Sequence, residues 1–145
     1  MQQIEVRRLQ REDCVDYFKS ICTLVCDHFG TAKDQEAVNT AVYASFENPN
    51  TDILAAFADG FLVAAAVGNQ TQTLTGKSYL VDSVVCHPEY RGQGIGRAVM
   101  RGLFARAQEL EIGQVFLTCS RPEAQTFYQA LGFQEKDTTV YTRSS

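Results

Sequence analysis

A glycine-rich run, Arg91-Gly92-Gln93-Gly94-Ile95-Gly96, is the segment of this sequence that best indicates a ligand site. It lies between an apolar stretch, Tyr79 to Cys86, and a segment whose apolar residues have helical spacing. At such a junction the first backbone N–H groups of the helix lack internal acceptors, and the helix dipole adds positive charge. Glycine lets an anion approach the backbone closely and adopts positive φ angles at little cost. The run therefore predicts a phosphate site.

The spacing of the glycines limits which phosphate ligand is expected. A dinucleotide fingerprint would need a third glycine where the chain has Arg97, and an acidic residue at the end of the next strand. A mononucleotide P-loop needs Gly-Lys-Ser or Gly-Lys-Thr, and neither occurs in the sequence. Both common nucleotide motifs are therefore disfavoured.

The run resembles the acetyl-CoA turn of the GNAT superfamily of N-acetyltransferases, whose pattern is Arg/Gln-x-x-Gly-x-Gly/Ala. Arg91, Gly94 and Gly96 fill that pattern, at the end of the longer matching stretch 84–96. A second stretch, 118–133, resembles the family's second motif, an alanine followed by Phe-Tyr-x-x-x-Gly-Phe. The resemblance covers residues 79–133 in detail and the remainder through the order of its elements.

The resemblance implies acetyl-CoA as cosubstrate and no metal. It implies that the turn holds the CoA phosphates and that the pantetheine arm meets the strand backbone where two neighbouring strands part. The residues implied in cofactor binding are Val84, Val85, Cys86, Arg91, Gly92, Gln93, Gly94, Ile95, Gly96, Arg97, Arg121 and Ala124. Arg121 stands where the family motif often has asparagine, so whether it replaces that side chain in function is open.

The resemblance also implies that a primary amine attacks the thioester directly, without a covalent enzyme intermediate. Tyr128 falls on the general-acid position, where a phenol keeps its proton at neutral pH and can give it to the leaving thiolate. Asp82 falls where many members carry a glutamate that acts as the base. Strand alternation puts it on one face with Leu80, Val84 and Cys86, where desolvation would make a carboxylate a better proton acceptor. Because aspartate is shorter than glutamate, binding of the substrate ammonium is the alternative role.

Two other groups of reactive residues have simpler explanations. Cys22, Cys26 and His28 are spaced as metal ligands can be, but no second cluster follows them, and structural zinc needs four close ligands. Core packing is the favoured interpretation. His87 and Cys119 could form a nucleophilic pair, but the sequence offers no third group to orient them.

The bulk composition is that of one globular domain covering residues 1–145, with 45% hydrophobic residues and a net charge of −4. The negative charge argues against nucleic acid as a partner. The sequence has no apolar run long enough for a membrane span and no signal-peptide pattern, so no membrane partner and a cytoplasmic location are expected. Five cysteines are an odd number, mostly in apolar runs, which indicates reduced thiols.

The elements that must position these residues follow from periodicity and turn signals. Strands are predicted over 4–9, 53–58, 61–67, 79–86, 114–119 and 133–142, and helices over 13–29, 34–46, 94–111 and 122–131. Asp59-Gly60 suits a tight hairpin turn, and Gly68 to Lys77 either extends the second arm or forms a loop. With the resemblance, this predicts an α/β (α+β) GNAT fold in the order βααβββαβαβ, with about six to seven strands in a mixed sheet and about four helices.

The predicted function is acetyl-CoA-dependent N-acetylation of a primary amine. A small-molecule amine is the first choice of acceptor, because the chain has no additional peptide-binding module. The alternatives are a protein or peptide N-acetyltransferase and a non-catalytic acyl-CoA sensor. A homodimer is compatible with the family, although no residue indicates one.

Overall fold

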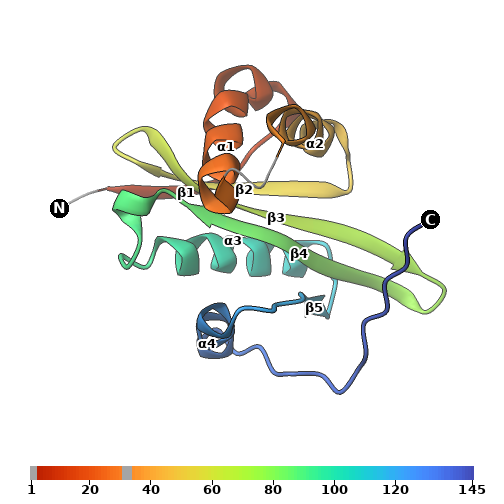
Figure 1. Ribbon diagram of the computed structural model, residues 1–145. Coiled ribbons are helices and arrows are strands. Elements are labelled where there is room, and N and C mark those ends of the chain that lie inside the picture. The colour runs from red at the N-terminus through yellow and green to blue at the C-terminus, as the bar shows by residue number, and fades with distance from the viewer. Residues whose placement is uncertain (1–2, 31–33) are drawn as a thin grey trace.

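The computed structural model describes residues 3–30 and 34–145, which form a mixed sheet in the order β1-β2-β3-β4-β5 with helices on both faces (Figure 1). The strands are β1 (Ile4–Arg8), β2 (Thr51–Ala58), β3 (Phe61–Thr73), β4 (Gly76–Cys86) and β5 (Val115–Phe116). The helices are α1 (Cys14–Phe29), α2 (Gln35–Glu47), α3 (Ile95–Glu109) and α4 (Pro122–Ala130), with short 3-10 turns η1 (Arg11–Asp13) and η3 (Pro88–Tyr90). Among the residues that the structure describes, no helix combines the length and hydropathy that crossing a membrane requires.

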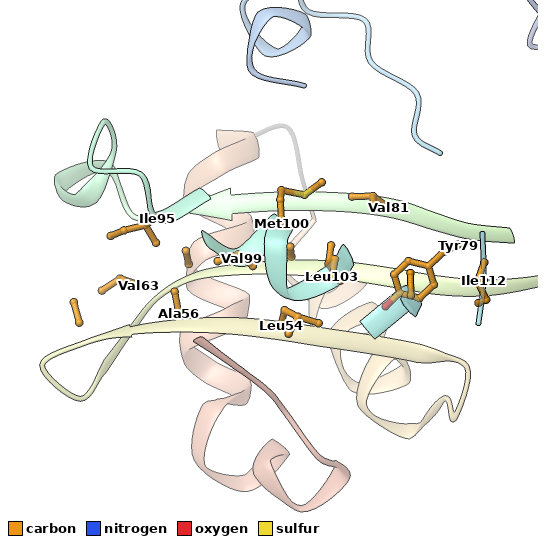
Figure 2. Packing of buried hydrophobic residues seen from close by; sticks show 14 residues of the cluster. Leu54, Ala56, Val63, Tyr79, Val81, Ile95, Val99, Met100, Leu103 and Ile112 are labelled. Atoms are coloured by element: carbon orange, nitrogen blue, oxygen red, sulfur yellow. The ribbon is translucent and has the colours of Figure 1, made fainter. Parts of the chain in front are cut away.

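The two faces of the sheet are filled by alternating residues of the central strands. On β2, Leu54 and Ala56 pack with α3, whereas Ile53, Ala55 and Phe57 pack with α1 and α2. Figure 2 shows the first of these clusters, in which Val99, Met100 and Leu103 of α3 lie over β2, β3 and β4. Strand alternation of period two and helical spacing of four therefore build a three-layer arrangement of helices, sheet and helix.

The β2–β3 hairpin confirms the prediction from its turn residues. Asp59 and Gly60 have φ angles of 50° and 89°, the positive values that a two-residue turn needs to match the strand twist. β3 continues to Thr73 and pairs with β4 as far as Gly76, so the segment after Gly68 extends the second arm.

A buried polar cluster joins four elements at the end of the sheet where β5 pairs with β4. The Tyr79 hydroxyl donates to Asp52 at 2.7 Å, and the same carboxylate lies 3.2 Å from Arg106 Nε and 3.6 Å from Arg8. Burial and the bond to Asp52 raise the pKa of Tyr79, so the phenol stays protonated. A Cβ on Gly68 would lie 2.4 Å from the Tyr79 ring, so only glycine leaves room for it.

β4 contains a bulge at Asp82, which changes the faces that simple alternation predicts. Val67 pairs with Ser83 and Gly68 with Val81, so that Asp82 has no partner on β3. The extra residue moves the α3-facing positions from Tyr79 and Val81 to Val84 and Cys86, and Val85 turns towards Leu24 of α1. The prediction that Asp82 shares an apolar face with Val84 and Cys86 was therefore wrong.

The C-terminal part of the chain departs from the predicted strands. Residues 133–142 form no strand, and the strand predicted over 114–119 contains only Val115–Phe116. The described residues thus have five strands, fewer than the six to seven predicted. A run of three charged residues, Glu135, Lys136 and Asp137, interrupts the apolar alternation, and Val140 and Tyr141 are 67% and 88% exposed, so no hydrophobic face anchors the segment.

Candidate active site

β4 and the chain that follows β5 separate and leave a cavity of about 800 Å³ between them. Their parallel pairing covers only Tyr79 with Val115 and Leu80 with Phe116. Beyond it, β4 has no strand partner on that side among the described residues, and residues 82–84 and 86 border the cavity together with residues 118–121. The predicted parting of two neighbouring strands is therefore present.

The glycine turn forms one wall of this cavity. Gly92 and Gly94 have φ angles of 78° and 79°, and Gly94 is the N-cap of α3. An added Cβ at either glycine would meet nothing within 4 Å, so the space above the backbone is open. The first intrahelical bond recorded at this end runs from the Ala98 N–H to the Gly94 carbonyl, so the N–H groups before Ala98 lack intrahelical acceptors. An open backbone, free N–H groups and a positive helix end fit a phosphate group.

Gly96 faces α4, because a Cβ there would lie 3.5 Å from the Phe127 ring, an ordinary van der Waals distance. The start of α3 and α4 are therefore neighbours at this position. Ile95, between the two glycines, is 2% exposed and anchors the turn in the core. The turn is thus fixed on its inner side and open on its outer side.

Three arginines border the cavity and add positive charge to it. Arg91 Nε donates to the Cys86 carbonyl at 3.3 Å, which ties the turn to the end of β4. Arg97 follows the turn on α3, and Arg121 is the N-cap of α4 with a side chain 58% exposed, 3.5 Å from Glu123. Ala124 donates its N–H to the Arg121 carbonyl at 3.1 Å and also lines the cavity.

Tyr128 lies on α4 and lines the cavity between β4 and the segment that follows β5. Its ring contacts Phe127 and Phe133 edge-on, with centroid distances of 5.1 and 5.8 Å. Burial raises the pKa of Tyr128, nearby Cys119 raises it further, and Arg121 opposes them. A phenol with a raised pKa stays protonated at neutral pH and can serve as an acid.

Asp82 lines the same cavity, but in a different environment from the one predicted. Its position in the bulge makes it exposed, so the desolvation expected from an apolar strand face is absent. The carboxylate faces the cavity from β4, and Ser83 and Val84 border the cavity beside it.

The structure brings nearly all of the predicted site residues together around the one cavity. The exceptions are Val85, whose buried side chain lies against α1, and Gln93, whose amide folds back to the Glu89 carbonyl at 3.3 Å. Sequence reasoning missed several lining residues: His28, Phe29, Ser83, Tyr90, Thr118, Cys119, Ser120, Glu123 and Phe127. Most of them adjoin the two motifs and could have been found from them, but His28 and Phe29 come from a distant helix that carries no motif.

The two other groups of reactive residues are not assembled. The Nδ1 of His87 accepts the Glu89 N–H at 3.1 Å outside the cavity, whereas Cys119 lines it. Burial raises the pKa of the Cys86 thiol against the opposing effect of Arg91, which disfavours a thiolate nucleophile. Within residues 3–30 and 34–145, no three potential ligands are grouped as a metal site would need.

The sequence matches a known family along most of its length. The model of the acetyltransferase (GNAT) family matches residues 16–133. The chain therefore belongs to the GNAT acetyltransferases, a family of acyltransferase enzymes.

Individual relatives are more distant. An uncharacterized N-acetyltransferase, ycf52, from Porphyra purpurea is 38% identical over 50 residues, which are 34% of this chain and 28% of the relative. The match thus spans little more than a quarter of that relative's length.

Solved structures share the whole fold. A possible acetyltransferase from Clostridium difficile 630 has a TM-score of 0.82 at 19% identity, covering 98% of this chain and 97% of its own. The aminoglycoside N-acetyltransferase AAC(6')-Iy in complex with CoA has a TM-score of 0.82 at 14% identity, covering 99% and 96%. A ribosomal-protein-alanine N-acetyltransferase from Brucella melitensis biovar Abortus 2308 has a TM-score of 0.76 at 19% identity, covering 99% and 100%. At these identities the likeness concerns the fold.

Proposed function

We propose that residues 1–145 act as one domain that transfers an acetyl group from acetyl-CoA to a primary amine on a small molecule. The observation that carries the proposal is the cavity itself, because it joins an open anion site at the start of α3 to the phenol of Tyr128. A fold-level neighbour is a CoA complex of an aminoglycoside acetyltransferase, which supports both the cosubstrate and a small amine acceptor.

The residues divide into a cofactor part and an acceptor part. The N–H groups at the turn, with Arg91 and Arg97, would hold the CoA phosphates, and the backbone at Val84 and Cys86 would meet the pantetheine arm. Arg121 adds positive charge at the opposite wall of the cavity. Bound acetyl-CoA supplies an activated acetyl group as a thioester.

Tyr128 acts as the general acid and gives its proton to the departing sulfur. Asp82 attracts the substrate ammonium, because an exposed carboxylate at the cavity wall is a favourable neighbour for a cation. The amine attacks the acetyl carbonyl directly, so the chain needs no nucleophile of its own.

The test has two stages. Acetyl-CoA should raise the Tm of the protein, and CoA thiol should then be released with at least one amine from a panel containing sisomicin, spermidine, lysine and a peptide with N-terminal alanine. Turnover on the peptide alone would identify a protein acetyltransferase instead. A thermal shift without turnover on any amine would favour an acyl-CoA sensor, and no thermal shift would exclude the proposed cosubstrate.

A further inference from the structure

His28 reaches the active-site cavity from the side of the sheet opposite the phosphate turn. It lies in the last turn of α1, which covers one face of the sheet, whereas α3 and α4 lie on the other side (Figure 1). Yet His28 lines the same cavity as the turn and Tyr128. The cavity therefore opens to both faces through the gap where β4 has no strand partner, and His28 stands at its α1 end.

The imidazole of His28 is held in place but not engaged by other polar groups. Its ring contacts Phe29 edge-on, with centroids 4.8 Å apart and an interplanar angle of 84°. No hydrogen bond from either ring nitrogen to another described residue is present, in contrast to His87, whose Nδ1 accepts a backbone N–H. The side chain is half-buried, so packing positions it while its nitrogens can meet a ligand.

The surroundings favour the neutral form of this imidazole. Burial lowers the pKa of His28 below its ordinary value of 6.5, and Arg121 and Arg91 lower it further. The charged groups that share the cavity with it are Asp82, Arg91, Arg97, Arg121 and Glu123. The other titratable groups there are Cys86, Tyr90, Cys119 and Tyr128, and Asp27 precedes it on α1. Burial and the two nearest arginines, Arg121 and Arg91, therefore favour the neutral form at His28 itself.

We infer that His28 is the proton acceptor for the substrate amine, and that Asp82, on the wall of the same cavity, attracts the ammonium into it. The inference rests on the proposed acetyl transfer and deepens it. A neutral imidazole takes a proton at neutral pH. The structure gives Asp82 an exposed position suited to attraction of a cation, while His28 occupies the half-buried position at the α1 end of the cavity.

The proton balance of the reaction follows. The substrate ammonium gives one proton to His28, and the freed nitrogen lone pair forms the C–N bond to the acetyl carbon. The C–S bond breaks with its electron pair leaving on sulfur, and Tyr128 protonates that sulfur. Tyr128 regains a proton from the remaining N–H of the acylated nitrogen through water. His28 releases its proton to solvent, so one proton appears for each ammonium acetylated.

The main test is the pH dependence of kcat/KM between pH 5 and 9, with the amine that reacts best in the panel. The wild-type profile should rise with a midpoint below 6.5 and then level off. His28→Gln should lower kcat/KM at pH 7 about 100-fold. Its profile should keep rising about tenfold per pH unit towards the pKa of the amine, because only free amine can then react.

An independent readout does not depend on turnover. The chain has two histidines, so His28→Gln assigns their NMR signals, and the pKa of His28 measured in the CoA-bound protein should equal the midpoint of the kinetic profile. His28→Ala should recover activity when imidazole is added, in proportion to its free-base concentration. A purely structural role would produce neither the match nor the rescue.

Controls separate the outcomes. His87→Gln removes the other histidine and should keep the wild-type rise of kcat/KM with its midpoint below 6.5. Each variant is accepted only if acetyl-CoA still raises its Tm. If His28→Gln fails this check, His28→Asn replaces it. A profile that still levels off above a midpoint below 6.5 in the His28 variants, or that loses this midpoint in Asp82→Asn instead, would overturn the assignment of His28 and leave the proposed function standing. If the wild type acetylates no amine, both proposals fail.

Discussion

Replacement of Tyr128 by phenylalanine isolates the proton that this residue is proposed to donate. Phenylalanine keeps the ring contacts with Phe127 and Phe133 at the same positions, and the hydroxyl donates to no other described residue. We therefore expect the free energy of unfolding to change by less than about 1 kcal/mol. The affinity for acetyl-CoA should also be unchanged, because the phosphate turn lies on a different element.

The expected kinetic effect of Tyr128→Phe is large. Loss of a general acid lowers kcat by about 10²- to 10⁴-fold, which corresponds to about 3 to 5 kcal/mol in the activation free energy. Calorimetry should give the Kd for acetyl-CoA, and release of CoA thiol at saturating amine should give kcat. A variant with wild-type kcat would refute the assignment, and a variant with lost acetyl-CoA affinity would show that the hydroxyl serves binding instead.

The pH profile of kcat provides a second check on Tyr128. Because burial raises the pKa of this phenol above its ordinary value of 10.0, the acid form persists through neutral and mildly alkaline pH. The fraction of active enzyme lost by deprotonation of Tyr128 should therefore appear only above pH 10. A fall in kcat near pH 8 that is absent from Tyr128→Phe would contradict this reasoning.

Three substitutions test the scaffold around the site. Gly94→Val places a β-branched residue at a φ angle of 79° and covers the open backbone, so the thermal shift with acetyl-CoA should vanish while the circular dichroism spectrum persists. Gly113→Ala, at an open position outside the cavity, is its control, and a retained thermal shift in Gly94→Val would contradict the phosphate site. Gly68→Ala forces a Cβ to within 2.4 Å of the Tyr79 ring and should lower the free energy of unfolding in urea by about 2 kcal/mol or more, and an unchanged Tm would argue against that close packing. Tyr79→Phe removes the hydroxyl that donates to buried Asp52 and should cost about 1 to 3 kcal/mol in the same assay, whereas a loss below about 0.5 kcal/mol would mean that the arginines suffice.

The sequence predicted the elements that depend on local signals. Asp59-Gly60 marked the hairpin, and the four-residue spacing of apolar residues from Ile95 to Ala107 marked α3. Each of these signals depends on local backbone geometry or on the residue pattern of a single element, so it can be recognised without knowing which other segments that element contacts. The glycine turn over 91–96 belongs to the same class, because Gly92 and Gly94 have the positive φ angles that its glycines predicted.

The remainder depends on contacts between distant segments. Alternation along β4 gave the wrong face for Asp82, because a bulge inserts one residue and nothing in Val81-Asp82-Ser83 marks it. The strand predicted over 133–142 does not form, because a strand needs a neighbouring strand to pair with and an apolar face to pack against. β5, with two residues, provides only a short edge for pairing. His28 was interpreted as a core residue because its place in the cavity depends on how α1 packs across the sheet.

The bulge at Asp82 separates two demands that a central strand usually places on the same residue. Neighbouring positions of β4 are committed to packing with α1 or α3, and a change in their size or polarity disturbs the core. The bulged residue has no partner on β3 and an exposed side chain that lines the cavity, so its identity is only weakly coupled to stability. Under the proposed function, natural or laboratory variation at this position would alter which amine is accepted while the sheet keeps its register, so specificity could evolve at residue 82 at little risk to folding.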